Sequence, residues 1–207
     1  KFQEKMIVDL LKKAGARLIS DNLSDLKAQV SANQRGAQLL EELILTYSEK
    51  TLRNSMAQIQ AIGENAVRSF FLSQLKFELE SEEIMDDGSR IHLLVKINKD
   101  TGGATFDFRA SSDQLKGNTN APRAVVSSAI MYCLRCLIKQ NLPLNEGFMK
   151  PISILTRQGS IVDPELGSAV AAGNVTTSQR IVDTIFLAFQ ACAASQGCMN
   201  NLSLGNQ

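Results

Sequence analysis

The sequence lacks most of the side chains that build metal centres and charge-relay catalysts. Its 207 residues contain a single histidine, His92, and no tryptophan. One histidine cannot form a metal site of two or three histidines, and a Ser-His-Asp or Cys-His arrangement would depend on this residue alone. The Gly-x-x-x-x-Gly-Lys-Ser/Thr run that cradles nucleotide phosphates is also absent. We therefore expect a structural role for His92, and we predict no metal site and no phosphate-loop nucleotide site in these residues.

An excess of one charge and long apolar runs are absent as well. The formal net charge is +1, which gives no electrostatic reason to expect nucleic acid or an anionic membrane as a partner. No apolar run approaches the roughly 20 residues that span a bilayer, and no signal-peptide pattern opens the sequence. Four cysteines in a chain of this length do not indicate a disulfide framework, so we expect a reducing cytoplasm.

Cys133 and Cys136 lie three residues apart in the apolar run from Ile130 to Ile138. Residues three apart share one face of a helix, so we expect two buried structural thiols. The alternative is a zinc or redox site. A four-cysteine site would also need Cys192 and Cys198, which are six residues apart and do not repeat the spacing of the first pair.

Periodicity divides the chain into a helical segment, residues 1–75, and an α+β core segment, residues 76–207. Apolar residues recur at helical spacing over 2–12, from 21 or 24 to about 47, and over 49–75. The short connection between the two long helices predicts that they pack antiparallel. Gly36 and Gly63 lie inside these helices and indicate close contacts or local bends. Because the chain begins at Lys1 inside a helical pattern, without Met or a capping residue, we expect an internal fragment of a larger domain.

From residue 76 the apolar period changes to two. Alternating segments at 77–80, 91–97 and 104–108, joined by turn residues, predict an antiparallel meander. A helix is expected from 124 to 138, a short strand over 152–155, and a last helix from 179 to about 194. We expect the glycine- and asparagine-rich tail, 197–207, to lead into a further strand. The predicted fold class is α+β.

Two polar turns precede the last two helices. The first is Gly117-Asn118-Thr119-Asn120-Ala121-Pro122-Arg123, and the second is Gly173-Asn174-Val175-Thr176-Thr177-Ser178-Gln179-Arg180. Proline suits the first turn of a helix, and Asn118, Thr119 or Asn120 can cap the free amides there. Each turn would place backbone N–H groups, side-chain amides and an arginine at a helix N-terminus, where a polar or anionic ligand can bind.

These turns also carry a family resemblance. The runs GNTNAPRAV, PLNEGFMKP, GNVTTSQRIVD and ASQGCMNNLSLGN occur in this order, after a helix that contains NLSDLKAQV. Together they resemble the core signature of the hydantoinase B/5-oxoprolinase family. The Cys-Leu-Arg-Cys run and the last segment look most like 5-oxoprolinases, with N-methylhydantoinases and acetone-type carboxylase subunits as relatives.

The residue types in these segments suit the opening of a cyclic amide. Asparagine and glutamine bind an amide N–H and a C=O together, helix N-terminal amides stabilise an oxyanion, and arginine holds a carboxylate or phosphate through two hydrogen bonds. For the asparagines the alternative is helix capping alone, and for the arginines it is a surface or interdomain ion pair. Asp107 matches the aspartate of the family's Phe-Asp-Phe segment, where it could serve as a general base or as a group that orients a metal ligand. The alternative for Asp107 is a position on a solvated strand face. The catalytic candidates are Asp107, Asn118, Asn120 and Asn174, and the substrate-binding candidates are Arg123, Thr177, Ser178, Gln179, Arg180, Asn200 and Asn201.

The resemblance implies an ATP-dependent hydrolase whose intact form opens 5-oxoproline to glutamate. ATP, Mg2+ and K+ would act in a hydantoinase A-like, actin-fold domain or subunit, a divalent metal site would lie upstream of Lys1, and an oligomer is expected. No cofactor is expected within the fragment itself, which we expect to be inactive alone. Two alternatives stay open. The substrate can be N-methylhydantoin, another cyclic ureide or a ketone to be carboxylated, or the segment can be a non-catalytic scaffold whose long helices dock the ATP-binding partner.

Overall fold

The computed structural model describes residues 2–191, which fall into two compact units. The first unit ends at Ala57 and the second begins at Gln58, inside one long helix. The change from helices to strands falls between residues 72 and 78, and the division into two segments at residues 75 and 76 stays a prediction. No helix among residues 2–191 combines the length and the apolar character that crossing a bilayer requires.

The first unit contains α1 (Glu4–Lys13) and α2 (Ile19–Tyr47). Glu4 in the first turn and Lys12 and Lys13 in the last turn of α1 complement the helix dipole. Gly15, with φ of +70°, follows the helix and allows the chain to reverse. The Lys27 ammonium of α2 lies 2.8 Å from the Glu4 carboxylate, which links the two helices.

The helix α3 (Glu49–Leu72) carries the chain from the first unit into the second. Its C-terminal half is buried through Gly63, Ala66, Val67 and Phe71. A Cβ on Gly63 would lie 3.0 Å from the Phe148 ring, so this glycine marks the close contact that the sequence predicts. The predicted antiparallel packing of α2 against α3 involves residues of both units, and it stays a prediction.

A four-stranded sheet forms the centre of the second unit, in the order β1-β2-β3-β4. The strands β1 (Glu78–Ile84), β2 (Arg90–Ile97) and β3 (Ala104–Asp107) form the predicted antiparallel meander. The last strand, β4 (Ile152–Leu155), has the predicted bounds and pairs parallel to β3. A parallel pair needs a crossover connection, and the helix α4 (Arg123–Leu137) provides it.

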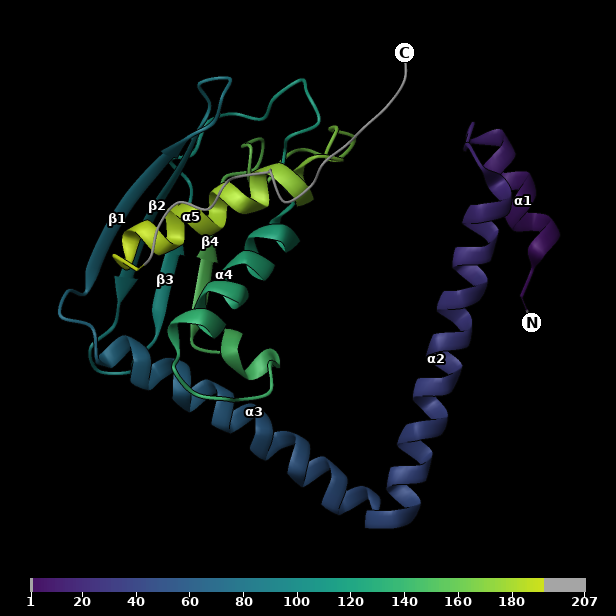
Figure 1. Cartoon of the computed structure of the whole chain (residues 1–207), viewed down its shortest axis with the longest axis horizontal. Helices are drawn as coiled ribbons and strands as arrows, with labels where there is room; N and C mark the ends of the chain where they lie inside the picture. The colour runs from purple at the N-terminus through teal and green to yellow at the C-terminus, as the bar shows by residue number, and fades with distance from the viewer. Residues whose placement is uncertain (1, 192–207) are drawn as a thin grey trace. The chain divides into compact units, whose positions relative to one another are not determined.

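The core lies between one face of the sheet and the helices α4 and α5 (Ser178–Ala188), which run across that face (Figure 1). The rings of Phe71, Phe106 and Phe189 meet there, with centroids 6.2–6.3 Å apart. The fold class is therefore α+β, which confirms the prediction from the sequence. The last helix ends at Ala188, before the predicted end at about 194, and the tail expected at 197–207 lies outside the described residues.

The two cysteines of α4 differ from the expectation. Cys133 is buried in the core, but Cys136 is exposed. Burial raises the pKa of the Cys133 thiol above its ordinary range. The prediction of two buried thiols is thus correct for Cys133 and wrong for Cys136, because the apolar face of α4 is narrower than the apolar run in the sequence. Cys192 and Cys198 lie outside the described residues.

Candidate functional site

The two polar turns meet in the folded chain. They belong to the loops that follow the parallel strands β3 and β4, whose carboxyl ends lie at the same edge of the sheet. The Ala172 N–H donates to the Asn118 carbonyl at 2.8 Å, and the Thr177 hydroxyl donates to the Thr119 carbonyl. We call residues 117–123 and 172–180 together the Gly-Asn junction.

Gly173 allows this close approach. A Cβ at this position would lie 2.1 Å from the Asn120 carbonyl oxygen and 2.9 Å from its carbon. Since a backbone carbonyl cannot swing away as a flexible side chain can, the junction requires a residue without a side chain here.

Asn120 holds the first turn together from inside. It is fully buried, and its Oδ1 accepts the Leu115 N–H at 2.7 Å. Its Nδ2 donates to the carbonyls of Leu115 and Ala169 at 2.9 Å and of Gly117 at 3.1 Å. Backbone groups therefore occupy both ends of this amide, and it joins the loop after β3 to the loop after β4.

The start of α4 corrects the predicted capping. The N-cap residue is Pro122, without a side-chain hydrogen bond, so neither Asn118, Thr119 nor Asn120 caps this helix. The physical reason is the second loop, which offers backbone partners to the residues of the first. Asn118 and Thr119 give their carbonyls to it, and Asn120 its side chain.

The second turn is a short π-helix, η2 (Gly173–Thr177), which continues directly into α5. Such π-turns are rare and are often found at functional sites. The Ser178 hydroxyl donates to the Asn174 carbonyl at 2.5 Å, and the Thr177 hydroxyl is bound to Thr119. Two of the predicted binding residues, Thr177 and Ser178, thus direct their hydroxyl protons to the backbone.

Three amide side chains of the junction remain without such a partner. Within residues 2–191, no hydrogen bond engages the side chains of Asn118, Asn174 or Gln179. Asn118 and Asn174 are exposed, and Gln179 is partly buried. The described chain therefore presents three amides, each with a free acceptor and free donors, beside the point where the two loops meet.

The two arginines have different surroundings. Arg123 is exposed, and one of its guanidinium nitrogens donates to the Ile154 carbonyl of β4 at 3.0 Å, which leaves other N–H donors for a ligand. Arg180 is partly buried, at 3.7 Å from Glu83 of β1 and 3.8 Å from the buried Asp183. These contacts match the ion-pair alternative for Arg180 and connect α5 to the sheet.

Asp107 lies at the end of β3, where the first loop begins. Arg109 binds its carboxylate with two nitrogens, Nη2 at 2.6 Å and Nε at 2.9 Å, and donates its backbone N–H at 3.0 Å. The hydrogen bond from the Arg109 side chain lowers the pKa of Asp107, against the opposing effect of burial. A carboxylate held in this way is a weak base, so the geometry favours an orienting role over general-base catalysis.

Two residues near the junction carry no distinguishing sequence signal. Arg109 lies two positions after Asp107, just beyond the end of β3, and nothing in the sequence marks it as the partner of that carboxylate. Ser160 is fully buried, and within residues 2–191 its hydroxyl has no hydrogen-bond partner. The neighbouring Ile161 accepts the Ala121 N–H at 2.7 Å, so Ser160 lies in a segment that packs against the first turn.

Three further residues singled out in the sequence do not lie at the junction within residues 2–191. His92 contacts Glu80 at 2.8 Å on the sheet, while its Nδ1 is buried without a partner within residues 2–191. Asn200 and Asn201 lie outside the described residues. Residues 2–191 contain no group of three histidine, cysteine, aspartate or glutamate side chains that could hold a metal ion.

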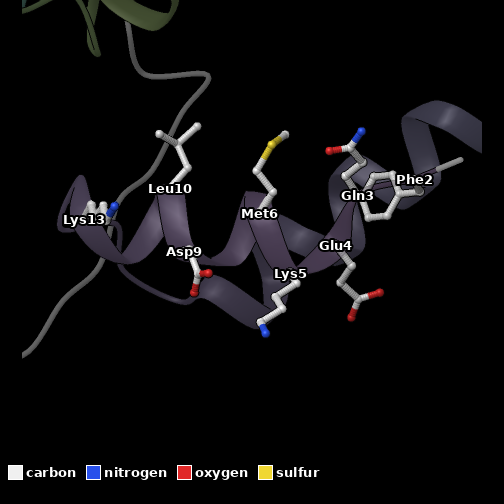
Figure 2. Close-up of a pocket in the computed structure, with 8 residues that line it drawn as sticks. All are labelled: Phe2, Gln3, Glu4, Lys5, Met6, Asp9, Leu10 and Lys13. Carbon is white, nitrogen blue, oxygen red and sulfur yellow. The ribbon is translucent and has the colours of Figure 1, made fainter.

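A hollow of about 730 Å³ lies in the first unit, along α1. Met6 and Leu10 project to one side of the helix, and Lys5 and Asp9 to the other (Figure 2). All its lining residues come from α1 and the two residues before it, so no second element brings polar groups toward a common point. It does not meet the criteria for a ligand site.

The sequence and the fold are those of a known class of protein. The sequence profile of the family described as hydantoinase B/oxoprolinase matches residues 1–207. The chain belongs to this family.

Individual relatives support this assignment. The chain is 45% identical to 5-oxoprolinase 1 of Arabidopsis thaliana over 99% of its length, and 44% identical to the 5-oxoprolinase of Dictyostelium discoideum over 100%. It is 40% identical to the 5-oxoprolinase of Saccharomyces cerevisiae over 99%. The chain spans only 17–18% of these three relatives.

Two solved structures share the fold. The ATP-dependent caprolactamase from Pseudomonas jessenii superposes with a TM-score of 0.77 and 20% identity, over 97% of this chain and 34% of that one. The nucleotide-free acetone carboxylase gives a TM-score of 0.61 and 11% identity, over 79% and 23%. At these identities the likeness concerns the fold alone.

Proposed function

We propose that the chain is part of the hydrolytic domain of an ATP-dependent cyclic-amide hydrolase, and that the intact protein converts 5-oxoproline to glutamate. The observation that carries this proposal is the 40–45% identity to three 5-oxoprolinases over nearly the whole chain. The matched region includes both turns of the Gly-Asn junction, so the similarity covers the described candidate site as well as the scaffold.

The junction suits the recognition of a small lactam. The unengaged amides of Asn118, Asn174 and Gln179 can donate to a ring carbonyl and accept from a ring N–H. The free guanidinium donors of Arg123 can bind the carboxylate of the substrate. Asn120 and Gly173 would then fix the two loops, and Asp107 with Arg109 would hold the start of the first loop.

We propose that ATP, Mg2+ and K+ act outside this chain, in a hydantoinase A-like domain or subunit with an actin fold, within an oligomeric protein in the cytoplasm. ATP cleavage there would supply the driving force for ring opening. The multidomain ATP-dependent enzymes among the structural neighbours support such an arrangement. A metal site, if the intact protein has one, is proposed to lie upstream of residue 1.

The test uses the full-length protein with its ATP-binding partner. It is incubated with ATP, Mg2+, K+ and 5-oxoproline, and ADP and glutamate are measured together, with N-methylhydantoin as a parallel substrate. Equimolar ADP and glutamate support the proposal. Turnover of N-methylhydantoin without glutamate formation would transfer the assignment to the cyclic-ureide alternative.

Variants separate the catalytic reading from the scaffold reading. Asn118→Ala with Asn174→Ala removes two exposed amides of the junction, and Asn54→Ala removes an exposed amide of α3 as the matched control. We expect a loss of kcat/KM of about a hundredfold in the double variant, from two hydrogen bonds worth about 1.4 kcal/mol each, and no change in the control. Unchanged kcat/KM together with unchanged stability in the double variant would support the scaffold, because these two exposed side chains take no part in the contact between the loops.

A further inference from the structure

We propose that the end of the sheet opposite the Gly-Asn junction carries a separate binding site for a doubly charged oxyanion such as phosphate. A depression of about 380 Å³ opens there, at the β2–β3 hairpin and the start of β4. Its lining includes three cations and three hydroxyl groups, from Arg68, Lys96, Lys150, Thr101, Thr105 and Ser153. The Thr101 hydroxyl lies in the turn and accepts the Gly103 N–H, so the two hydroxyls on the strands are those of Thr105 and Ser153.

The strand register builds one row of this site. Lys96 of β2 pairs with Thr105 of β3, and Thr105 pairs with Ser153 of β4. Residues that pair across neighbouring strands project from the same face, so one ammonium and two hydroxyls line up across three strands. Within residues 2–191, neither hydroxyl has a hydrogen-bond partner.

The three cations differ in their freedom to bind a ligand. Arg68 is engaged, because Glu64 accepts from its Nη2 at 2.7 Å and its Nε at 3.0 Å, and the Thr101 carbonyl accepts from its Nη1 at 2.8 Å. The two lysines have only long contacts, Lys96 with Glu78 at 3.9 Å and Lys150 with Glu64 at 4.0 Å. Arg68 therefore neutralises most of Glu64, and the ammonium groups of Lys96 and Lys150 keep their donors for an anion.

The chemistry of the lining selects the class of ligand. Two ammonium groups and two hydroxyls offer more donors than a carboxylate with one charge can use, whereas phosphate has several acceptor oxygens and up to two charges. The same lining would accept free phosphate or the phosphoryl group of a phosphomonoester. The site does not rest on the proposed function, since it lies at Ala104 and Ile152, where β3 and β4 begin, and the junction follows their ends.

The test measures anion binding to the intact protein by calorimetric titration at low ionic strength. Inorganic phosphate, phosphoserine and acetate are the probes, so that free phosphate, a phosphomonoester and a carboxylate are compared. The variants are Lys96→Ala and Lys150→Ala. The matched control is Lys99→Ala, which removes the same charge from the neighbouring turn, where Lys99 lies 4.3 Å from the Phe77 ring centroid and outside the depression.

We expect each lining variant to weaken phosphate binding about tenfold, the value of one charge-assisted hydrogen bond of about 1.4 kcal/mol, and the control to change it less than twofold. Tighter binding of phosphoserine than of phosphate would identify a phosphomonoester as the ligand, and the reverse would identify free phosphate. Equal effects of all three variants, acetate binding as tight as phosphate binding, or no phosphate binding would each overturn the proposal. Turnover of 5-oxoproline tests the proposed function separately, because these lysines lie outside the junction.

Discussion

Substitution of Gly173 by alanine tests the central structural element of the candidate site. The added Cβ would lie 2.1 Å from the Asn120 carbonyl oxygen, well inside the distance at which a carbon and an oxygen can approach. The two loops must therefore separate. The contacts at risk are the 2.8 Å bond between Ala172 and Asn118 and the bond between Thr177 and Thr119.

The magnitude follows from these contacts. Overpacking costs about 1–3 kcal/mol, and the loss of one or both hydrogen bonds adds about 1 kcal/mol each, so we expect a destabilisation of about 2–5 kcal/mol. In a domain of this size that lowers the thermal midpoint by roughly 5–20 °C. Because the separation displaces Asn118 and Asn174, we also expect 5-oxoproline turnover to fall in the intact protein.

Gly117 provides the matched control within the same junction. A Cβ there would meet nothing within 4 Å, and the residue does not have a positive φ. The assay compares thermal unfolding and turnover of Gly173→Ala and Gly117→Ala in the intact protein. If the two variants unfold at the same temperature and are equally active, the close approach at Gly173 does not support the site, and the reasoning fails.

Three further predictions concern single side chains. Asn120→Leu should lower the free energy of unfolding by about 2–4 kcal/mol, because it leaves buried backbone groups unpaired; chemical denaturation checks this, and a neutral effect contradicts it. The lowered pKa of Asp107 means that its bond to Arg109 stabilises the fold above the ordinary aspartate pKa and is lost as the pH falls through the folded value; Asp107→Asn should therefore flatten the acid limb of the stability curve, and an unchanged limb refutes the assignment. Cys133, with its raised pKa, should resist iodoacetamide at neutral pH while Cys136 reacts; mass spectrometry of the labelled peptides decides, and equal labelling would show that the core is open.

The strands show how far local patterns determine this fold. The strand over 152–155 was predictable because Pro151 precedes it and three of its four residues are apolar and typical of strands. The meander was predictable from a different local pattern, because turn residues separate its alternating segments. The parallel pairing of β4 with β3 was not predicted, because it depends on the crossover through α4 and not on any local pattern.

The junction shows where local patterns are insufficient. A glycine followed by short polar residues indicates a turn or a helix cap, and both turns fit that rule in isolation. In the structure, each turn satisfies backbone groups of the other, so Asn120 becomes a buried cross-link and residues 173–177 form a π-helix. This outcome depends on the close approach of Gly173 to Asn120, two residues that are far apart in the sequence, so no local pattern predicts it.

This arrangement separates two kinds of residue that look alike in the sequence. Asn120, Thr177 and Gly173 are committed to the contact between the loops, whereas the side chains of Asn118 and Asn174 are exposed and, within residues 2–191, without partners. A scaffold needs only the first kind, since exposed unpaired amides add little to stability. The scaffold and catalytic readings therefore make opposite predictions for the second kind. Alanine at Asn118 and Asn174 leaves the loop contact in place, so any loss of turnover in that variant reports on ligand binding or chemistry and not on the fold.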